Sequence, residues 1–453
     1  MIENATPDIG SAHAPSRAAP VHPSFGEAFR TFGRIGLLSF GGPAGQIALM
    51  HRVLVEEKRW LDETRFLHAL NYCMLLPGPE AMQLATYAGW LLHGVKGGLA
   101  AGLLFVLPGA AVLMALSAAY FFLGDVPLVA GLLFGLKAAV LALVVEALIR
   151  VAKRALKGSM AYPIAAAAFA GIAFLALPFP LVIAAAALWG TAARLGGAPD
   201  AGGAGGPTLS LAEQKSSGFA GFAGTTLLWL AIWFLPLVPL ALALGVEHVL
   251  VRQAIFFSQM AVVTFGGAYA VLAYVGQEAV ATYGWLGAGE MITGLGLAET
   301  TPGPLILVLM FVGFLGAARQ GGFDPLTGGI AGALVTLWFT FAPCFLFIFA
   351  GAPFIERVRN VQWLRSALAG VSAAVVGVIA SLALWFGLHV LFAEVGQASA
   401  GPFAWLVPEL GSFDPAAAAI AMAAGVALLR FHVNLFAVLG AAALAGMALR
   451  LLL

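Results

Sequence analysis

Long apolar runs with few charges dominate the pattern along this chain. Five of them, at 98–124, 126–149, 221–244, 326–354 and 366–392, are long enough to cross a hydrocarbon core of roughly 30 Å as helices. Shorter apolar stretches lie between them, and glycine or proline interrupts several of these. The pattern predicts an all-α polytopic membrane protein with broken or re-entrant helices.

Two interrupted stretches carry the same three landmarks in the same order. The first holds Phe40-Gly41-Gly42-Pro43, Trp60 and Pro77-Gly78-Pro79, and the second holds Phe265-Gly266-Gly267, Trp285 and Pro302-Gly303-Pro304. Each landmark recurs 225 positions later (40 to 265, 60 to 285, 77 to 302), and beyond the proline motifs the spacing grows to 235 (108 to 343). The sequence therefore predicts a tandem duplication, with copies at 25–194 and 247–453.

Three segments fall outside the two copies. Residues 1–24 are polar and rich in Ala and Pro without an apolar core, which indicates a disordered lead-in rather than a signal peptide. Residues 195–219 are rich in Gly and Ala, as expected of a linker. Residues 220–246 contain a span without a counterpart in the other copy, which would turn the second copy over in the membrane.

The distribution of Lys and Arg indicates which way each copy faces, because short loops rich in these residues stay in the cytoplasm. In each of three pairs of equivalent loops one loop is basic and its counterpart has no Lys or Arg, and the basic loop alternates between the copies. The basic loops are Arg52–Arg65, Arg357–Arg365 and Arg150–Lys157, and their counterparts are 276–290, 124–127 and 393–414. We therefore expect two inverted-topology repeats, with the N-terminus in the cytoplasm.

The same loops predict how the first proline motif crosses the membrane. If 52–65 and 150–157 are both cytoplasmic, an even number of crossings separates them, and 98–124 and 126–149 already supply that number. The segment 66–92 should therefore enter and leave on one side and turn at Pro77-Gly78-Pro79, where two prolines break the helix. For the glycine-motif segments the sequence leaves open whether they span or re-enter.

Composition narrows the function classes. Hydrophobic residues make up 61% of the 453 and charged residues 9%, against about 25% charged in soluble domains. Cys73 and Cys344 both lie in apolar runs, which argues against a disulfide framework. A membrane enzyme would need a metal-ligand, phosphate-loop or nucleophile motif, and the sequence shows none. We expect no cofactor, no metal and no nucleic-acid partner, and an ion gradient rather than ATP as the source of energy.

The paired stretches resemble the chromate ion transporter family. The resemblance is carried by Phe40-Gly41-Gly42-Pro43 with Gln46, by Val55-x-Glu57, Trp60 and Pro77-Gly78-Pro79, and by their repetition, which is similar to the long-chain members. The second copy departs from the pattern with Gly266-Gly267-Ala268, which lacks the proline. The resemblance implies a prokaryotic inner-membrane protein that exports chromate. It leaves open the coupling ion, a preference for chromate or sulfate, and assembly as a homodimer.

The breaks are the expected substrate site. Broken helices expose backbone N–H groups and positive dipole ends inside the bilayer, which favours a dianion. The alternative is close packing at the glycines and structural kinks at the prolines. The expected substrate-binding residues are Gly41, Gly42, Gln46, Pro77, Gly78, Pro79, Lys137, Gly266, Gly267, Thr300, Thr301, Pro302, Gly303 and Pro304.

Charged residues in the apolar stretches add further candidates. Lys137, whose repeat partner is Ser372, either compensates the dianion or pairs with Glu80 or Glu299. These two carboxylates either take up coupling protons or satisfy exposed N–H groups. Arg30 and Arg34 either guide anions or anchor their segment at the headgroups. An oxyanion carrier is the leading hypothesis, and a sulfate carrier and a gated anion channel are the alternatives.

Overall fold

The computed structural model describes residues 22–194, 219–265, 267–351 and 361–452. Within these ranges six helices are long and apolar enough to cross a membrane, so the predicted all-α polytopic membrane class is confirmed. The predicted lead-in and linker lie almost wholly outside the described residues, as do Gly266, Arg357 and Arg359.

The helices and strands follow one another in nearly the same order in both copies. They are α1 (Phe25–Leu38), α2 (Gly42–His51), η1 (Arg52–Glu57), α3 (Glu63–Cys73), α4 (Glu80–Leu123), α5 (Pro127–Ala155), α6 (Ala161–Ala173), α7 (Phe179–Ala192), α8 (Phe219–Phe234), α9 (Leu237–Leu244), α10 (Val249–Val263), α11 (Ala268–Gly276), η2 (Gln277–Thr282), α12 (Ala288–Glu299), η3 (Leu305–Leu307), α13 (Val308–Gln320), α14 (Pro325–Gly351), α16 (Gln362–Leu391), β1 (Val395–Ala400), β2 (Phe403–Pro408), η5 (Leu410–Ser412), α17 (Pro415–Leu429) and α18 (Leu435–Leu452).

The first glycine motif is the tip of a helical hairpin. After α1 the chain reverses through Gly41 and Gly42, whose φ angles of +82° and +70° are readily adopted only by glycine. The return leg brings Lys58 into an ion pair with Glu27, in the first turn of α1, at 2.9 Å. The two ends of the segment 25–58 therefore lie together, opposite the tip of the hairpin. In the second copy the return leg comes back along α10, where the ring of Tyr283 lies 5.6 Å from that of Phe256.

Each proline motif also separates the two legs of a hairpin. In the first copy α3 and the start of α4 lie side by side, with the rings of Tyr72 and Tyr87 5.8 Å apart. The backbone then leaves helical geometry at His93 and Gly94, and the chain reverses again. A Cβ at Gly89 would lie only 2.3 Å from the carbonyl oxygen of Gly97, which shows how closely the two parts of α4 pack. The second copy repeats this order with α12, η3–α13 and α14.

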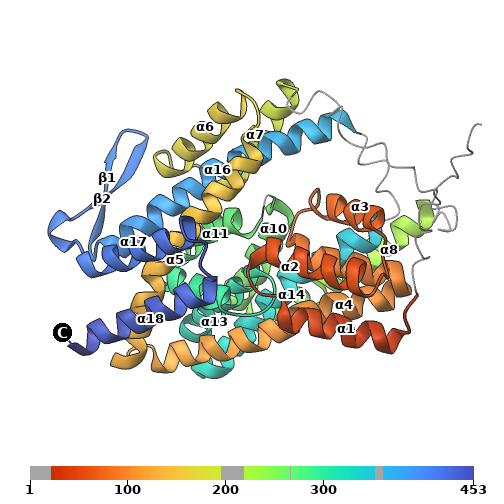
Figure 1. Cartoon of the computed structure of the whole chain (residues 1–453), viewed down its shortest axis with the longest axis horizontal. Helices are drawn as coiled ribbons and strands as arrows, with labels where there is room; N and C mark the ends of the chain where they lie inside the picture. Colours follow the sequence, from red (N-terminus) through yellow and green to blue (C-terminus); the bar gives the residue numbers. More distant parts are fainter. Residues whose placement is uncertain (1–21, 195–218, 266, 352–360, 453) are drawn as a thin grey trace, which may run out of the picture.

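The helices form two groups that exchange parts between the copies. We call α1–α4 with α8–α14 the motif group, and α5–α7 with α16–α18 the arm group (Figure 1). Within the arm group, α6 and α7 of the first copy pack on α16 of the second, and α17 and α18 of the second pack on α5 of the first. Glycines 235 positions apart allow both contacts: a Cβ at Gly135 would lie 1.9 Å from the Ala442 oxygen, and one at Gly370 would lie 2.2 Å from the Ala186 oxygen.

A β-hairpin follows α16, where the sequence had indicated only a loop without Lys or Arg. Strands β1 and β2 pair antiparallel, with Val395 opposite Pro408 and Ala400 opposite Phe403. The N–H of Ala404 also donates to the carbonyl of Phe174, beside the α6–α7 turn, at 2.8 Å. The hairpin therefore adds a further contact between the second copy and the first.

Opposite orientation of the copies, which we propose from the loop charges, makes a labelling prediction. Arg59, Lys157 and Thr282 are all exposed, whereas the native Cys73 and Cys344 are buried. In intact cells an impermeant thiol reagent should label Thr282→Cys and spare Arg59→Cys and Lys157→Cys. Permeabilised cells, in which all three should react, are the control. Equal labelling of positions 59 and 282 in intact cells would contradict the inverted placement.

Candidate functional site

The four hairpin tips meet around one small cavity. Its lining comes from both glycine motifs and both proline motifs: Pro43, Gln46, Gly78, Pro79, Glu80, Ala81, Thr264, Ala268, Pro304, Leu305 and Ile306. The cavity has a volume of about 10 Å³, about the room that one water molecule needs. This conformation therefore holds the site closed, because a tetrahedral oxyanion is larger than water.

Four helices begin at this cavity. They are α2, α4, α11 and the continuous helix Leu305–Gln320, formed by η3 and α13. The first N–H groups of a helix have no acceptor within that helix, and its N-terminal end carries a partial positive charge. Four such ends directed at one point form an environment suited to an anion without a single cationic side chain.

Two reciprocal hydrogen bonds hold the tips together. The N–H of Gly78 donates to the carbonyl of Thr264 at 2.9 Å, and the N–H of Gly303 donates to that of Ser39 at 2.7 Å. Both the donors and the acceptors are 225 positions apart, so the proline motif of each copy is bound by the glycine motif of the other. These two amides are therefore occupied in this conformation, and the donors left for a ligand belong to the helix N-termini.

Gln46 makes a third hydrogen bond between the copies. Its Nε2 donates to the carbonyl of Gly303 at 2.6 Å, while its Oε1 is buried without a partner among the described residues. Gln83 lies beside the other tip in the same way, with Nε2 donating to Pro77 at 2.7 Å and Oε1 unpaired. Unpaired buried polar atoms are uncommon in folded proteins, and here both flank the cavity tips.

The two candidate carboxylates occupy different places. Glu80 lines the cavity at the start of α4. Glu299 is buried at the end of α12, outside the cavity lining, and accepts a hydrogen bond from the Tyr269 hydroxyl at 2.5 Å. The sequence analysis missed Tyr269, and the one signal for it was its position directly after the second glycine motif.

Several other expected residues lie apart from the cavity. The hydroxyls of Thr300 and Thr301 both donate to the carbonyl of Leu297, at 2.8 and 2.7 Å, and so end helix α12. Arg30 and Arg34 lie on the exposed face of α1, along a shallow groove with Leu37 and Leu38. No group of three or more metal-ligating side chains comes together in the part of the chain that the structure describes.

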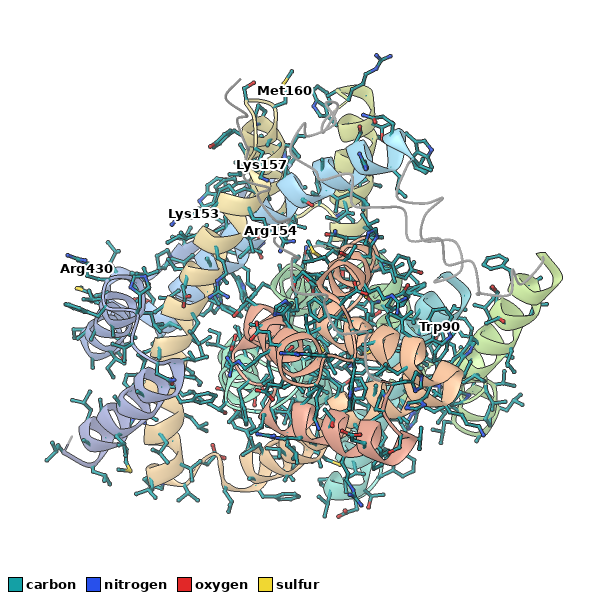
Figure 2. The ribbon with its side chains drawn as sticks, turned by 45° about the vertical axis from the view of Figure 1, so that its right-hand side comes forward. Trp90, Lys153, Arg154, Lys157, Met160 and Arg430 are labelled. Carbon is teal, nitrogen blue, oxygen red and sulfur yellow. The ribbon has the colours of Figure 1, made fainter. Side chains whose placement is uncertain are left out.

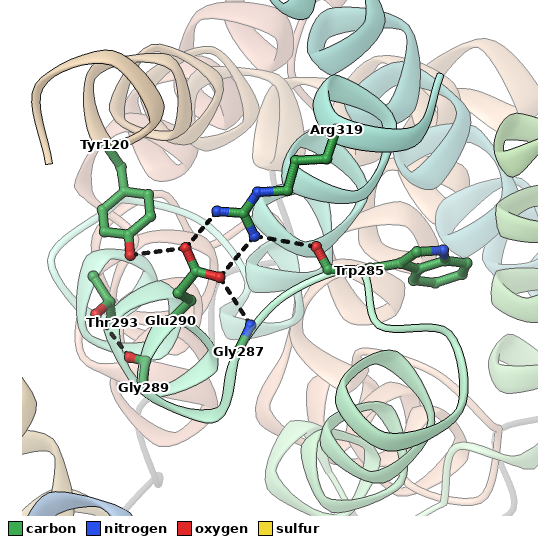
Figure 3. A network of polar contacts seen from close by, with 7 residues as sticks. All are labelled: Tyr120, Trp285, Gly287, Gly289, Glu290, Thr293 and Arg319. Atoms are coloured by element: carbon green, nitrogen blue, oxygen red, sulfur yellow. Dashed lines mark hydrogen bonds and ion pairs between the residues drawn. The ribbon is translucent and has the colours of Figure 1, made fainter. Parts of the chain in front are cut away.

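Lys137 lies at the opposite end of α12 from the cavity. A Cβ on Gly289 would lie 3.4 Å from its Nζ, so the lysine lies beside the first turn of α12, where Gly289 directly precedes Glu290. The pairing with Glu80 or Glu299, one of the two alternatives that the sequence left open, is not formed. Glu290 itself accepts hydrogen bonds from Nη1 and Nη2 of Arg319 at 2.7 Å each, from the Tyr120 hydroxyl at 3.1 Å and from the N–H of Gly287 at 2.8 Å (Figure 3).

Comparison with known protein families matches two regions of the chain. The family described as Chromate transporter matches residues 26–191 and 251–447. The chain belongs to the chromate transporter family. Members of this family are transport proteins rather than enzymes. No solved structure matches the chain.

Three curated relatives cover most of this chromate transporter family member. The chromate transport protein of Pseudomonas aeruginosa is 34% identical over 81% of this chain and 82% of its own. A probable chromate transport protein of Synechococcus elongatus is 27% identical over 81% of this chain and 86% of its own. The chromate transport protein of Cupriavidus metallidurans is 26% identical over 77% and 79%.

Removing the Gln46 amide should impair transport more than it impairs folding. Gln46→Leu strands the buried carbonyl of Gly303 at the cavity, and an unpaired buried group costs about 1–3 kcal/mol, so chromate transport should fall by about tenfold or more. Gln253→Leu is the matched control, because Gln253 is equally buried, donates to Gly313 at 3.0 Å and also has an unpaired Oε1. Uptake per folded protein should fall in the first variant and stay near normal in the second.

Alanine at Gly78 or Gly303 should also reduce transport. The two residues have φ angles of +113° and +94°, which cost a side chain about 1–2 kcal/mol. Gly245→Ala, at φ +84° with open space around it, imposes a similar backbone strain away from the cavity. Transport should be lost in the first two variants and kept in the third, with similar thermal stability in all three. Equal transport in all three would show that the tips tolerate the strain.

Proposed function

We propose that this chain is a secondary active transporter that exports chromate, a tetrahedral dianion, across the prokaryotic inner membrane, with its N-terminus in the cytoplasm. The observation that carries the proposal is the convergence of four helix N-termini on one cavity between the two copies. Two of the relatives above are themselves named chromate transport proteins.

The direction follows from the charge of the substrate. A membrane potential contributes about 2.3 kcal/mol per elementary charge per 100 mV, so a dianion that leaves a negative interior is stabilised by about 4.6 kcal/mol per 100 mV. The carrier must then mainly compensate the loss of hydration as the dianion enters the protein. The helix N-termini at the cavity and the amide of Gln46 are suited to that task.

The small size of the cavity favours a carrier over a channel. The closed tips leave room for about one water molecule, so a dianion can bind only after the tips or the groups around them rearrange. Access that alternates between two sides is the usual mechanism of carriers built from inverted repeats. In the proposed orientation Lys137 lies on the outer side of the cavity, and we propose that it meets the dianion on its way out.

Coupling to a proton gradient would use Glu80 and Glu299. The first lines the cavity, and the second is buried against Tyr269 between the second glycine motif and the second proline motif. A proton on Glu80 removes a negative charge from the cavity lining, so the binding of the proton and the binding of the dianion affect each other there. Sulfate, which has the same charge and shape, is the natural competing substrate.

Transport of labelled chromate and sulfate by the purified chain in proteoliposomes tests this function. We expect saturable chromate movement toward the positive compartment, inhibition by sulfate, and a response to an imposed pH gradient. Glu80→Gln should weaken that response while leaving the response to the potential. Glu247→Gln is the control for Glu80→Gln, because it removes an exposed carboxylate that does not line the cavity.

Three results would contradict the proposal. Movement that does not saturate with chromate concentration would indicate a channel. Transport of sulfate without chromate would favour the alternative carrier. Identical rates with and without both gradients would remove the secondary active mechanism.

A further inference from the structure

Helix α5 carries two arginines, Arg150 and Arg154, one turn apart and beside the proline motifs. The Arg154 Nη2 lies 2.9 Å from the sulfur of Met74, which directly follows α3 and precedes Pro77 by three residues. Because α5 belongs to the arm group, Arg154 reaches the motif group from outside it, and Arg150 lies one turn earlier on the same helix.

Most of the hydrogen-bonding capacity of these arginines is unused. A guanidinium has five donors, and in the described part of the chain the one recorded bond of Arg154 goes to a thioether, a weak acceptor. Arg150 pairs with Glu146 one turn earlier, and about half of its side chain stays exposed. The planar fork of arginine matches the oxygens of an oxyanion, and two of them balance a dianion.

The equivalent positions of the second copy have different chemistry. With the spacing of 235 that relates Gly135 to Gly370, Arg150 corresponds to Trp385 and Arg154 to His389. These two rings pack against each other with centroids 4.8 Å apart, and the His389 Nδ1 lies 2.9 Å from the Trp385 carbonyl. The end of α16 therefore has no counterpart to the arginine pair, although its helix occupies the equivalent place.

We propose that Arg150 and Arg154 form an oxyanion-binding site that loads the transporter from the side where α5 ends. The dianion takes up the free donors of both guanidiniums, next to the first proline motif, and passes from there to the cavity. Trp385 and His389 offer no such site at the end of α16, so the two faces of the protein bind the dianion unequally. The inference rests on the proposed transport of a dianion and adds its loading site and its direction.

Substitution of the arginines tests the site. Arg150→Gln and Arg154→Gln should each raise the KM for chromate about tenfold or more, because charge-assisted hydrogen bonds are lost, with little change in Vmax. The effect should occur in inside-out vesicles, which present the end of α5 to the substrate, and should be small in right-side-out vesicles. Arg154→Lys should keep part of the affinity, since it keeps the charge without the fork.

Lys153→Gln is the matched control. It removes the same charge from the neighbouring position, but Lys153 and Arg154 lie on different sides of α5, with Arg154 toward α3 (Figure 2). Its KM should stay at the wild-type value on both faces. A rise equal to that of Arg154→Gln would show a general effect of surface charge and overturn the site.

A gain of function separates the inference from a folding defect. His389→Arg should lower the KM for loading from the face opposite to the end of α5, a result that misfolding cannot produce. Unchanged KM values in Arg150→Gln and Arg154→Gln, with normal chromate transport by the wild type, would overturn the arginine site and leave the proposed function standing. Absence of oxyanion transport by the wild type would instead overturn the proposed function.

Discussion

The reciprocal hydrogen bonds between Gly78 and Thr264 and between Gly303 and Ser39 are the interaction on which the structure depends. A helix that breaks inside a bilayer leaves N–H and C=O groups without water, and each unpaired group costs several kcal/mol. Here an N–H group at the proline motif of each copy donates to a carbonyl group at the glycine motif of the other copy. Neither copy could close its own breaks in this way, so two copies are a condition of the fold.

The same reciprocity governs the arm group. Each copy packs its last two helices on the long helix of the other copy, through Gly135 in one case and Gly370 in the other. Hydrogen bonds between the hairpin tips therefore hold the motif group together, while helix packing between the copies holds the arm group together. Under the proposed function, access can change sides by movement between the two groups, and the hydrogen bonds between the tips need not break.

The sequence predicted the four breaks because glycine and proline act on the local backbone, and their common spacing identified the pairs. It could not predict which tip binds which, because a hydrogen bond between Gly78 and Thr264 has no local signature. Lys137 was expected at the site because it lies near the middle of its apolar run. The structure instead brings the last turns of α5 to the proline motif, through Arg154 and Met74. Arg150 and Arg154, which the sequence placed in a basic loop, are thus part of α5, and Arg154 contacts the residue that follows α3.

The backbone at the site is nearly symmetric, but its side chains are not. Gln46, Glu80 and Gln83 of the first copy correspond to Val271, Leu305 and Val308 in the second, and Arg150 corresponds to Trp385. The second hairpin pair is also the more deeply enclosed, since every residue from Met291 to Glu299 is buried while Leu67 of α3 and Met74, directly after it, are exposed. Helix dipoles from both copies can thus act on a dianion, but polar and charged side chains reach it mainly from the first. On the predicted duplication and the proposed function, the second copy serves as the apolar support for a site whose chemistry the first copy provides.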